Sequence, residues 1–129
     1  MGIVPYKIQR ERFDFMQLLI LILQDTRYMD KILTELMKAG LRGGTLLDCE
    51  GVLQAIAHNS VEPPPIFGAL RQYLNPERGD TNKMLISAVS DSEAETASKI
   101  INRVTGGLDK ANTGILITLP ILKIEGLAK

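Results

Sequence analysis

The chain has few of the residues that carry most metal and nucleophilic chemistry. It contains one cysteine, Cys49, one histidine, His58, and no tryptophan. A single cysteine excludes an internal disulfide, and one cysteine with one histidine cannot form a four-ligand structural zinc cluster within one chain. The G-x-S-x-G, H-E-x-x-H and Walker-type lysine motifs are also missing. We therefore expect a protein that is not an enzyme and has no resident cofactor or metal; an active site shared across a subunit interface is the remaining alternative.

A net charge and a long apolar run are absent too. Lysine plus arginine and aspartate plus glutamate both number 15, so there is no net basic field to hold a nucleic acid or an anionic bilayer. The longest apolar run, residues 18–23, is far shorter than the roughly 20 residues that span a bilayer, and no signal-peptide pattern precedes it. These features predict a cytoplasmic protein that binds no nucleic acid and does not insert into a membrane.

What the chain does have is the length and composition of one globular domain. Of its 129 residues, 45% are hydrophobic and 23% are charged, which is typical of a domain that buries a modest core. Residues 1–14 show neither helical nor alternating order. We interpret residues 1–14 as an N-terminal extension and residues 15–129 as the domain.

The first half of the domain has the pattern strand, helix, strand. Residues 15–23 are short and apolar, which is typical of a strand buried on both faces. A helix should follow, because Asp25 or Thr26 can begin it and Gly40 can end it. Its apolar positions recur at spacings of three and four, at Met29, Ile32, Leu33, Leu36 and Met37. Residues 45–53 alternate between two faces, which predicts a half-exposed strand.

The second half repeats this plan. Residues 84–90 predict a strand, and Ser92 with Glu95 matches the S-x-x-E capping box that begins a helix. The apolar stripe of that helix comprises Ala94, Ala97, Ile101, Val104 and Leu108. Residues 114–124 predict the last strand, and Pro120 within it cannot donate a ladder hydrogen bond, so this strand must lie at an edge or end.

Two strand-helix-strand halves in one short chain predict an α+β fold, the ferredoxin-like βαββαβ sandwich. The handedness of the crossovers places both helices on the same face of one antiparallel sheet. The strands at 15–23 and 114–124 are nevertheless apolar on both faces, whereas a solvated face shows polar alternation. The pattern thus indicates that something covers the second face, and another copy of the chain is the simplest candidate.

A long loop at residues 54–83 separates the second and third strands. Ordinary hairpins are joined by two to five residues, and longer connections usually serve a function. Residues 63–65 are three prolines, which favour a stiff arm, and apolar residues within 66–74 recur at helical spacing. We expect a mobile, functional loop with a short helix; an irregular insertion without function is the alternative.

Residues at the ends of the predicted strands resemble the PII family of nitrogen and carbon regulators. The run Gly40-Leu41-Arg42-Gly43-Gly44-Thr45 is similar to the family's G-[IV]-x-G-x-T, and Gly51 stands where the family has a glycine at the loop base. Asn112-Thr113-Gly114 and the strand after it are similar to the family's T-G segment and final strand. The resemblance covers about residues 15–127.

The resemblance implies a homotrimeric signalling protein with three clefts between subunits. PII proteins bind adenine nucleotides there, so ATP, ADP or AMP would be the small-molecule effector, and the long loop would engage a target protein. The family's G-D-G-K phosphate loop is shortened to residues 112–115 and has Ile115 in place of the lysine. The C-terminal R-x-R-T-G segment, the modifiable tyrosine and the Q-K-G signature are missing, so uridylylation is not expected.

Five residues are candidate ligand contacts on chemical grounds. Glycine lets backbone amides approach an anion, and threonine offers a hydroxyl; the candidates are Gly43, Thr45, Gly51, Thr113 and Gly114. For the glycines, helix termination and turn formation are equal alternatives. Arg71 and Arg78 could supply charge for a phosphate, although the role of a solvated surface arginine fits each of them better.

The remaining reactive side chains have simpler interpretations. His58 lies in a polar context and is more typical of an exposed histidine, but a threefold axis could bring three copies to one metal, as in a metal-responsive or scaffold trimer of the CutA type without nucleotide binding. Cys49 is more typical of a small buried hydrophobe than of a nucleophile. Asp48 and Glu50 share a strand face that we interpret as the solvated side of the sheet.

Overall fold

The computed structural model describes residues 15–59 and 82–127. Its elements are β1 (Met16–Leu23), a 3-10 turn η1 (Thr26–Tyr28), α2 (Met29–Lys38), β2 (Thr45–Cys49), α3 (Val52–Asn59), β3 (Asn82–Ser90), α5 (Asp91–Thr105) and β4 (Gly114–Pro120). The predicted N-terminal extension, the proline segment at 63–65, the short helix near 66–74, and Arg71 and Arg78 all lie outside the described residues.

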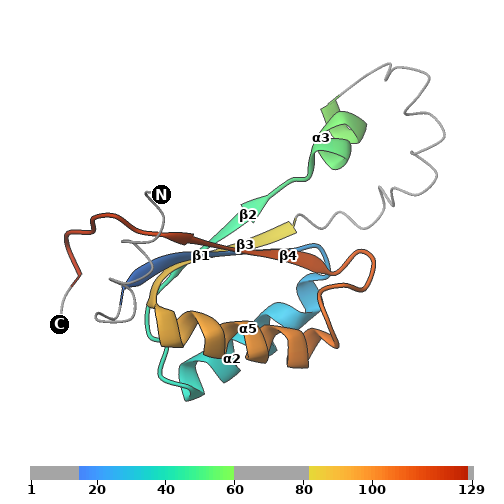
Figure 1. Cartoon of the computed structure of the whole chain (residues 1–129). Helices are drawn as coiled ribbons and strands as arrows, with labels where there is room; N and C mark the ends of the chain where they lie inside the picture. Colours follow the sequence, from blue (N-terminus) through green and yellow to red (C-terminus); the bar gives the residue numbers. More distant parts are fainter. Residues whose placement is uncertain (1–14, 60–81, 128–129) are drawn as a thin grey trace, which may run out of the picture.

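The four strands form one antiparallel sheet in the order β2-β3-β1-β4. Helices α2 and α5 lie together against one face of this sheet (Figure 1). The predicted ferredoxin-like βαββαβ fold is therefore confirmed. β4 is an edge strand and Pro120 is its last residue, which agrees with the position that proline requires.

The core fills the layer between the helices and the sheet. Alternate residues of the central strand β1 are almost fully buried against α2 and α5: Leu19, Leu21 and Leu23. Ile32 of α2 and Ile101 of α5 are equally buried opposite them. Each such side chain contributes about 1.5–3 kcal/mol of hydrophobic free energy relative to its exposed state, so this layer holds the domain together.

Helix α5 begins two residues earlier than its predicted capping box. The cap is Ser90 with Glu93: the Glu93 amide donates to Ser90 Oγ over 3.2 Å, and the Ser90 amide donates to Glu93 Oε1 over 2.8 Å. The prediction of Ser92 with Glu95 was wrong. Because β3 runs directly into α5, the last extended residue of the strand is itself the N-cap.

Two strands are shorter than their sequence patterns predicted. β2 ends at Cys49 because its partner β3 begins at Asn82, the residue opposite it. The apolar residues that follow belong to α3, in which the Ala55 amide donates to the carbonyl of Gly51 over 2.9 Å. The long connection after β2 therefore begins with a helix, which the sequence analysis did not predict.

The second shortened strand, β4, ends at Pro120, which pairs with Gln17 near the start of β1.

Candidate functional site

One face of the sheet is apolar and is not covered by either helix. The strand register places its residues side by side; for example, Ile20 of β1 stands between Ile86 of β3 and Ile117 of β4. We call this the open sheet face, and its apolar residues are Leu18, Ile20, Ile22, Leu47, Met84, Ile86, Ala88, Ile115, Ile117 and Leu119. Within the described part of the chain Ile115 remains 58% exposed. A contiguous apolar surface of this kind marks an interaction site.

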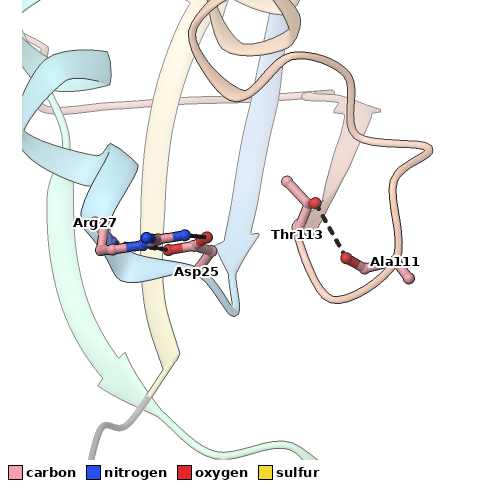
Figure 2. A network of polar contacts seen from close by, with 4 residues as sticks. All are labelled: Asp25, Arg27, Ala111 and Thr113. Carbon is pink, nitrogen blue, oxygen red and sulfur yellow. Dashed lines mark hydrogen bonds and ion pairs between the residues drawn. The ribbon is translucent and has the colours of Figure 1, made fainter.

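Thr113 ends the turn before β4 and is attached to the end of β1, and Gly114 is the first residue of β4. The carbonyl of Thr113 accepts hydrogen bonds from the amides of Gln24 (3.0 Å) and Asp25 (3.3 Å). Thr113 is only 4% exposed, and its hydroxyl donates to the carbonyl of Ala111 over 3.4 Å (Figure 2). Asn112 takes a left-handed conformation with φ of 60°, which asparagine tolerates. The Thr113 hydroxyl would have to leave this bond to donate to an anionic ligand.

Gly43 and Thr45 lie at the start of β2, on the other edge of the sheet. The carbonyl of Gly43 accepts a hydrogen bond of 2.6 Å from the hydroxyl of Ser87 on β3. No atom lies within 4 Å of the place where a Cβ would stand at Gly43, so space does not require glycine there. Thr45 pairs with Ile86 and is exposed, which leaves its hydroxyl accessible.

Gly51 lies between β2 and α3, and a Cβ at this position would stand 3.7 Å from the Asn82 side-chain nitrogen. Asp48 of β2 and Lys83 of β3 stand directly opposite each other in the sheet and form an ion pair.

Cys49, the last residue of β2, is partly buried. This desolvation is the larger cause that raises the pKa of its thiol, and the charge of Asp48 is the second. A raised pKa reduces the thiolate fraction, so the thiol is a poor nucleophile at neutral pH.

The five candidate ligand contacts do not converge in one chain. Gly43, Thr45 and Gly51 belong to the β2 edge, whereas Thr113 and Gly114 belong to the β4 edge, with β3 and β1 between them. Three strand spacings separate the edges, about 14 Å in total. A small ligand can therefore contact both groups only if two copies of the chain contribute one edge each.

The sequence analysis missed a polar cluster at the end of β1. Asp25 accepts hydrogen bonds from Arg27 Nε (2.8 Å) and Nη2 (2.7 Å) (Figure 2), and these bonds raise the pKa of Arg27 further above its usual value. The Arg27 Cζ atom and the Lys110 Nζ atom each lie 5.9 Å from the centroid of the Tyr28 ring. The i, i+2 spacing of Asp25 and Arg27 was the available signal. The cluster joins the loop before β4 to the start of α2.

A metal centre is not formed by the part of the chain that is described. No group of three histidine, cysteine, aspartate or glutamate side chains lies close enough to hold an ion there. The backbone at position 58 belongs to α3, and the side chain of His58 is outside the described atoms. Among the described helices, none has the length and apolarity that crossing a membrane requires.

Solved structures of other proteins have a similar fold, although comparisons of sequence find no relative. No protein-family model matches the sequence, and a search of curated proteins finds no match. A functionally unknown protein from Pediococcus pentosaceus is similar in structure, with 13% identity and a TM-score of 0.57 over 89% of this chain and 100% of that one. Arabidopsis thaliana PII, solved with citrate bound, matches with 13% identity and a TM-score of 0.55 over 84% of this chain and 78% of that one. The chain therefore has a divergent PII-like fold.

Proposed function

We propose that the chain is a non-enzymatic, PII-like regulatory protein that works in the cytoplasm as a homotrimer. It binds a small anionic effector, an adenine nucleotide such as ATP, ADP or AMP, in clefts between its copies. It regulates a partner protein through the long connection between β2 and β3. The proposal rests on one observation. In this PII-like fold a long connection joins β2 to β3, and its first helix, α3, lies away from the body of the domain (Figure 1).

The open sheet face supports the assembly. Burial of apolar surface contributes about 25 cal/mol per Å², and this face has an unbroken apolar row on β1, flanked on both sides by apolar residues of β3 and β4. A sheet with helices on one side only needs a second layer on the other. Another copy of the chain offers a surface of the same character, so association removes apolar area from water on both partners.

The separation of the candidate contacts supports an effector site between copies. The β2 edge presents the exposed backbone of Gly43 and the hydroxyl of Thr45, and the β4 edge presents the turn at Thr113 and Gly114. Neither group has enough donors alone to enclose a nucleotide. Joined across an interface, they form two sides of one cleft, and Gly51 lies at its rim, where the long connection begins.

The start of the long connection supports a docking role. Helix α3 begins three residues after the end of the edge strand β2, and its first two residues, Val52 and Leu53, have exposed apolar side chains. An effector bound beside Gly51 would contact the residue that precedes this helix. Binding can therefore bias the position of α3, and the partner protein reads that position.

Mass and calorimetry together test the proposal. Light scattering or native mass spectrometry of the full chain should give three times the chain mass. Titration with ATP, ADP, AMP, cyclic dinucleotides and citrate should give one effector per chain for at least one compound. A trimer that releases no heat with any nucleotide would reject the nucleotide part of the proposal. Turnover of a bound nucleotide would contradict the non-enzymatic role, and metal binding by the trimer that is lost in a His58→Ala variant would favour the CutA-type alternative.

A further inference from the structure

The solvent side of the two covering helices carries three cations around one carboxylate. On α2, Lys31 Nζ lies 3.4 Å and Lys38 Nζ 3.8 Å from Glu35 Oε1. Arg103 Nη2 of α5 lies 3.5 Å from Glu35 Oε2. The Glu35 side chain is only 20% exposed, whereas the side chains of the three cations are 65–68% exposed. The cations are thus far more open to water than the carboxylate that they share.

One carboxylate cannot neutralise this group. A hydrogen bond from Lys31, helped by the neighbouring positive charges and opposed by desolvation, lowers the pKa of Glu35. Glu35 is therefore ionised at neutral pH and sets one negative charge against three positive ones. Lys99 lies one turn before Arg103 on the same side of α5 and adds a further positive charge. We call Lys31, Lys38, Lys99 and Arg103 the basic helix surface.

The other carboxylates of these two helices are displaced from the basic helix surface. On α5 they all lie within its first five residues. Glu95, the last of them, is about 12 Å along the helix axis from Arg103, and it limits the surface one turn before Lys99. On α2, Asp30 is next to Lys31 in sequence, and successive helix residues point in different directions. A chain without net charge therefore concentrates positive charge on this part of its helix layer.

The basic helix surface is separate from the regions used in the proposed function. Helices α2 and α5 cover one face of the sheet, opposite the open sheet face, and α3 lies away from both of them (Figure 1). Association of copies through the open sheet face leaves the helix layer directed outward. The basic helix surface thus stays accessible in an assembly, and the long connection after β2 does not start beside it.

The chemistry of this surface favours a protein partner over a lipid, a nucleic acid or a small anion. Met37 is the exposed large apolar side chain that the described residues of α2 and α5 present, which is too little to insert into a bilayer. Four cations with a carboxylate among them are fewer than the about 6–10 phosphate contacts of a typical nucleic-acid complex. For a small anion, pairing with cations this exposed contributes only about 0.2–1 kcal/mol each. A protein segment with several carboxylates can contact all four cations and exclude water from them.

We propose that the basic helix surface binds an acidic segment of a partner protein, which presents several Asp or Glu side chains to α2 and α5. Glu35 keeps Lys31, Lys38 and Arg103 close together and competes with the carboxylates of the partner. Charge complementarity of this kind speeds association and sets specificity. The inference goes beyond the proposed function, because it requires neither a trimer nor an effector.

An acidic peptide tests the inference. The probe is a fluorescein-labelled peptide of alternating Glu and Gly residues, with a Gln and Gly peptide as its neutral counterpart, and fluorescence anisotropy with the full-length protein measures binding. Lys99→Glu should weaken binding of the acidic peptide about tenfold; Lys99 pairs with no described carboxylate, so this variant should fold normally. Lys123→Glu, in the segment after β4, makes the same change of charge on an exposed residue elsewhere and should change binding less than about twofold.

Glu35→Gln gives a result of opposite sign. Removal of the competing carboxylate should tighten binding of the acidic peptide about threefold or more, and added salt should weaken binding by the wild type and the variant alike. Weaker binding by Glu35→Gln would contradict the competition. Circular dichroism of each variant confirms that the comparison is between folded proteins.

Three results would overturn the inference. The first is equal binding of the acidic and neutral peptides, and the second is an equal loss in Lys99→Glu and Lys123→Glu. The third is binding of polyuridylate, or of phosphatidylcholine vesicles with one quarter phosphatidylglycerol, by a protein that does not bind the acidic peptide. None of these results bears on the trimer mass or on nucleotide binding, so the proposed function and this inference can fail separately.

Discussion

Gly114 lies so close to Ile22 that a Cβ at position 114 would stand 2.6 Å from the Ile22 carbonyl oxygen. The two residues belong to the neighbouring strands β1 and β4, where Ile22 stands opposite Ile115 and Gly114 stands opposite Leu23. The close approach lets the carbonyl of Thr113 accept hydrogen bonds from the amides of Gln24 and Asp25 after the end of β1. Glycine at 114 therefore has a packing reason that is independent of any ligand.

Gly114→Ala should destabilise the fold. The added methyl meets backbone rather than a flexible side chain, and overpacking of this kind costs about 1–3 kcal/mol. Urea denaturation measures the loss. Gly43→Ala is the matched control, because nothing lies within 4 Å of its Cβ position, and its stability should stay within about 0.5 kcal/mol of the wild type. Equal losses in the two variants would argue against the close approach.

Ile117→Lys should dissociate the assembly without unfolding the domain. The side chain lies on the open sheet face, halfway along the edge strand β4 and opposite Ile20 of β1, and an ammonium there cannot be buried without a partner. Size-exclusion chromatography with light scattering should show a monomer. The control is Met37→Lys on α2, which is 72% exposed on the helix side of the sheet and should leave the mass unchanged. Effector binding should be lost with the assembly; full binding by the monomer would contradict a site between copies.

Ser90→Ala should cost about 1 kcal/mol of stability, the usual loss when an N-cap serine is removed. Ser92→Ala should cost less, because Ser92 Oγ contacts Ser90 Oγ over 3.2 Å and caps no helix amide. Thermal unfolding of both variants measures the difference. A larger loss for Ser92→Ala would show that the helix begins where the sequence pattern first suggested.

Glu35 should make stability depend on pH in the acid range. A hydrogen bond from Lys31, with the charges of Lys38 and Arg103, lowers the pKa of the Glu35 carboxyl in the folded chain. Because the folded pKa is below the unfolded value of about 4.3, this contribution is present above that value and is lost as pH falls through the folded pKa. Urea midpoints of wild type and Glu35→Gln should converge at low pH. Added salt should reduce the difference at neutral pH, since the cationic partners Lys31, Lys38 and Arg103 are exposed.

Cys49 should react slowly with alkylating reagents. Partial burial and the Asp48 carboxylate both raise the pKa of the thiol, so less thiolate is present at a given pH. The rate of reaction with iodoacetamide between pH 7 and 9 measures this, and Asp48→Asn should increase the rate at neutral pH. A rate equal to that of a free thiol would show that the environment of Cys49 is more open than the structure indicates.

Much of the fold could be predicted because local patterns and the core agree. The apolar spacing around Ile32 and Leu36 predicted α2, and the residues at those positions are buried under the sheet. Element ends were less predictable. The residues after Cys49 are compatible with either a strand or a helix. They can continue β2 only where β3 lies beside them to form hydrogen bonds, and β3 begins opposite Cys49. Similarly, Ser90 and Ser92 both match a cap, and the point at which β3 meets α5 selects Ser90.

The arrangement of the candidate ligand contacts could not be predicted from the sequence either. Sequence alone named Gly43, Thr45, Gly51, Thr113 and Gly114, but it could not show that they divide between opposite edges of the sheet, because edge order is set by long-range pairing. It did determine the antiparallel βαββαβ plan and the apolar character of both faces of β1, since side-chain period and turn residues are local properties. Only the tertiary structure decided that the second face is open, that β2 ends at Cys49 and that β4 ends at Pro120 rather than at residue 124, because hydrogen-bond partners come from distant residues.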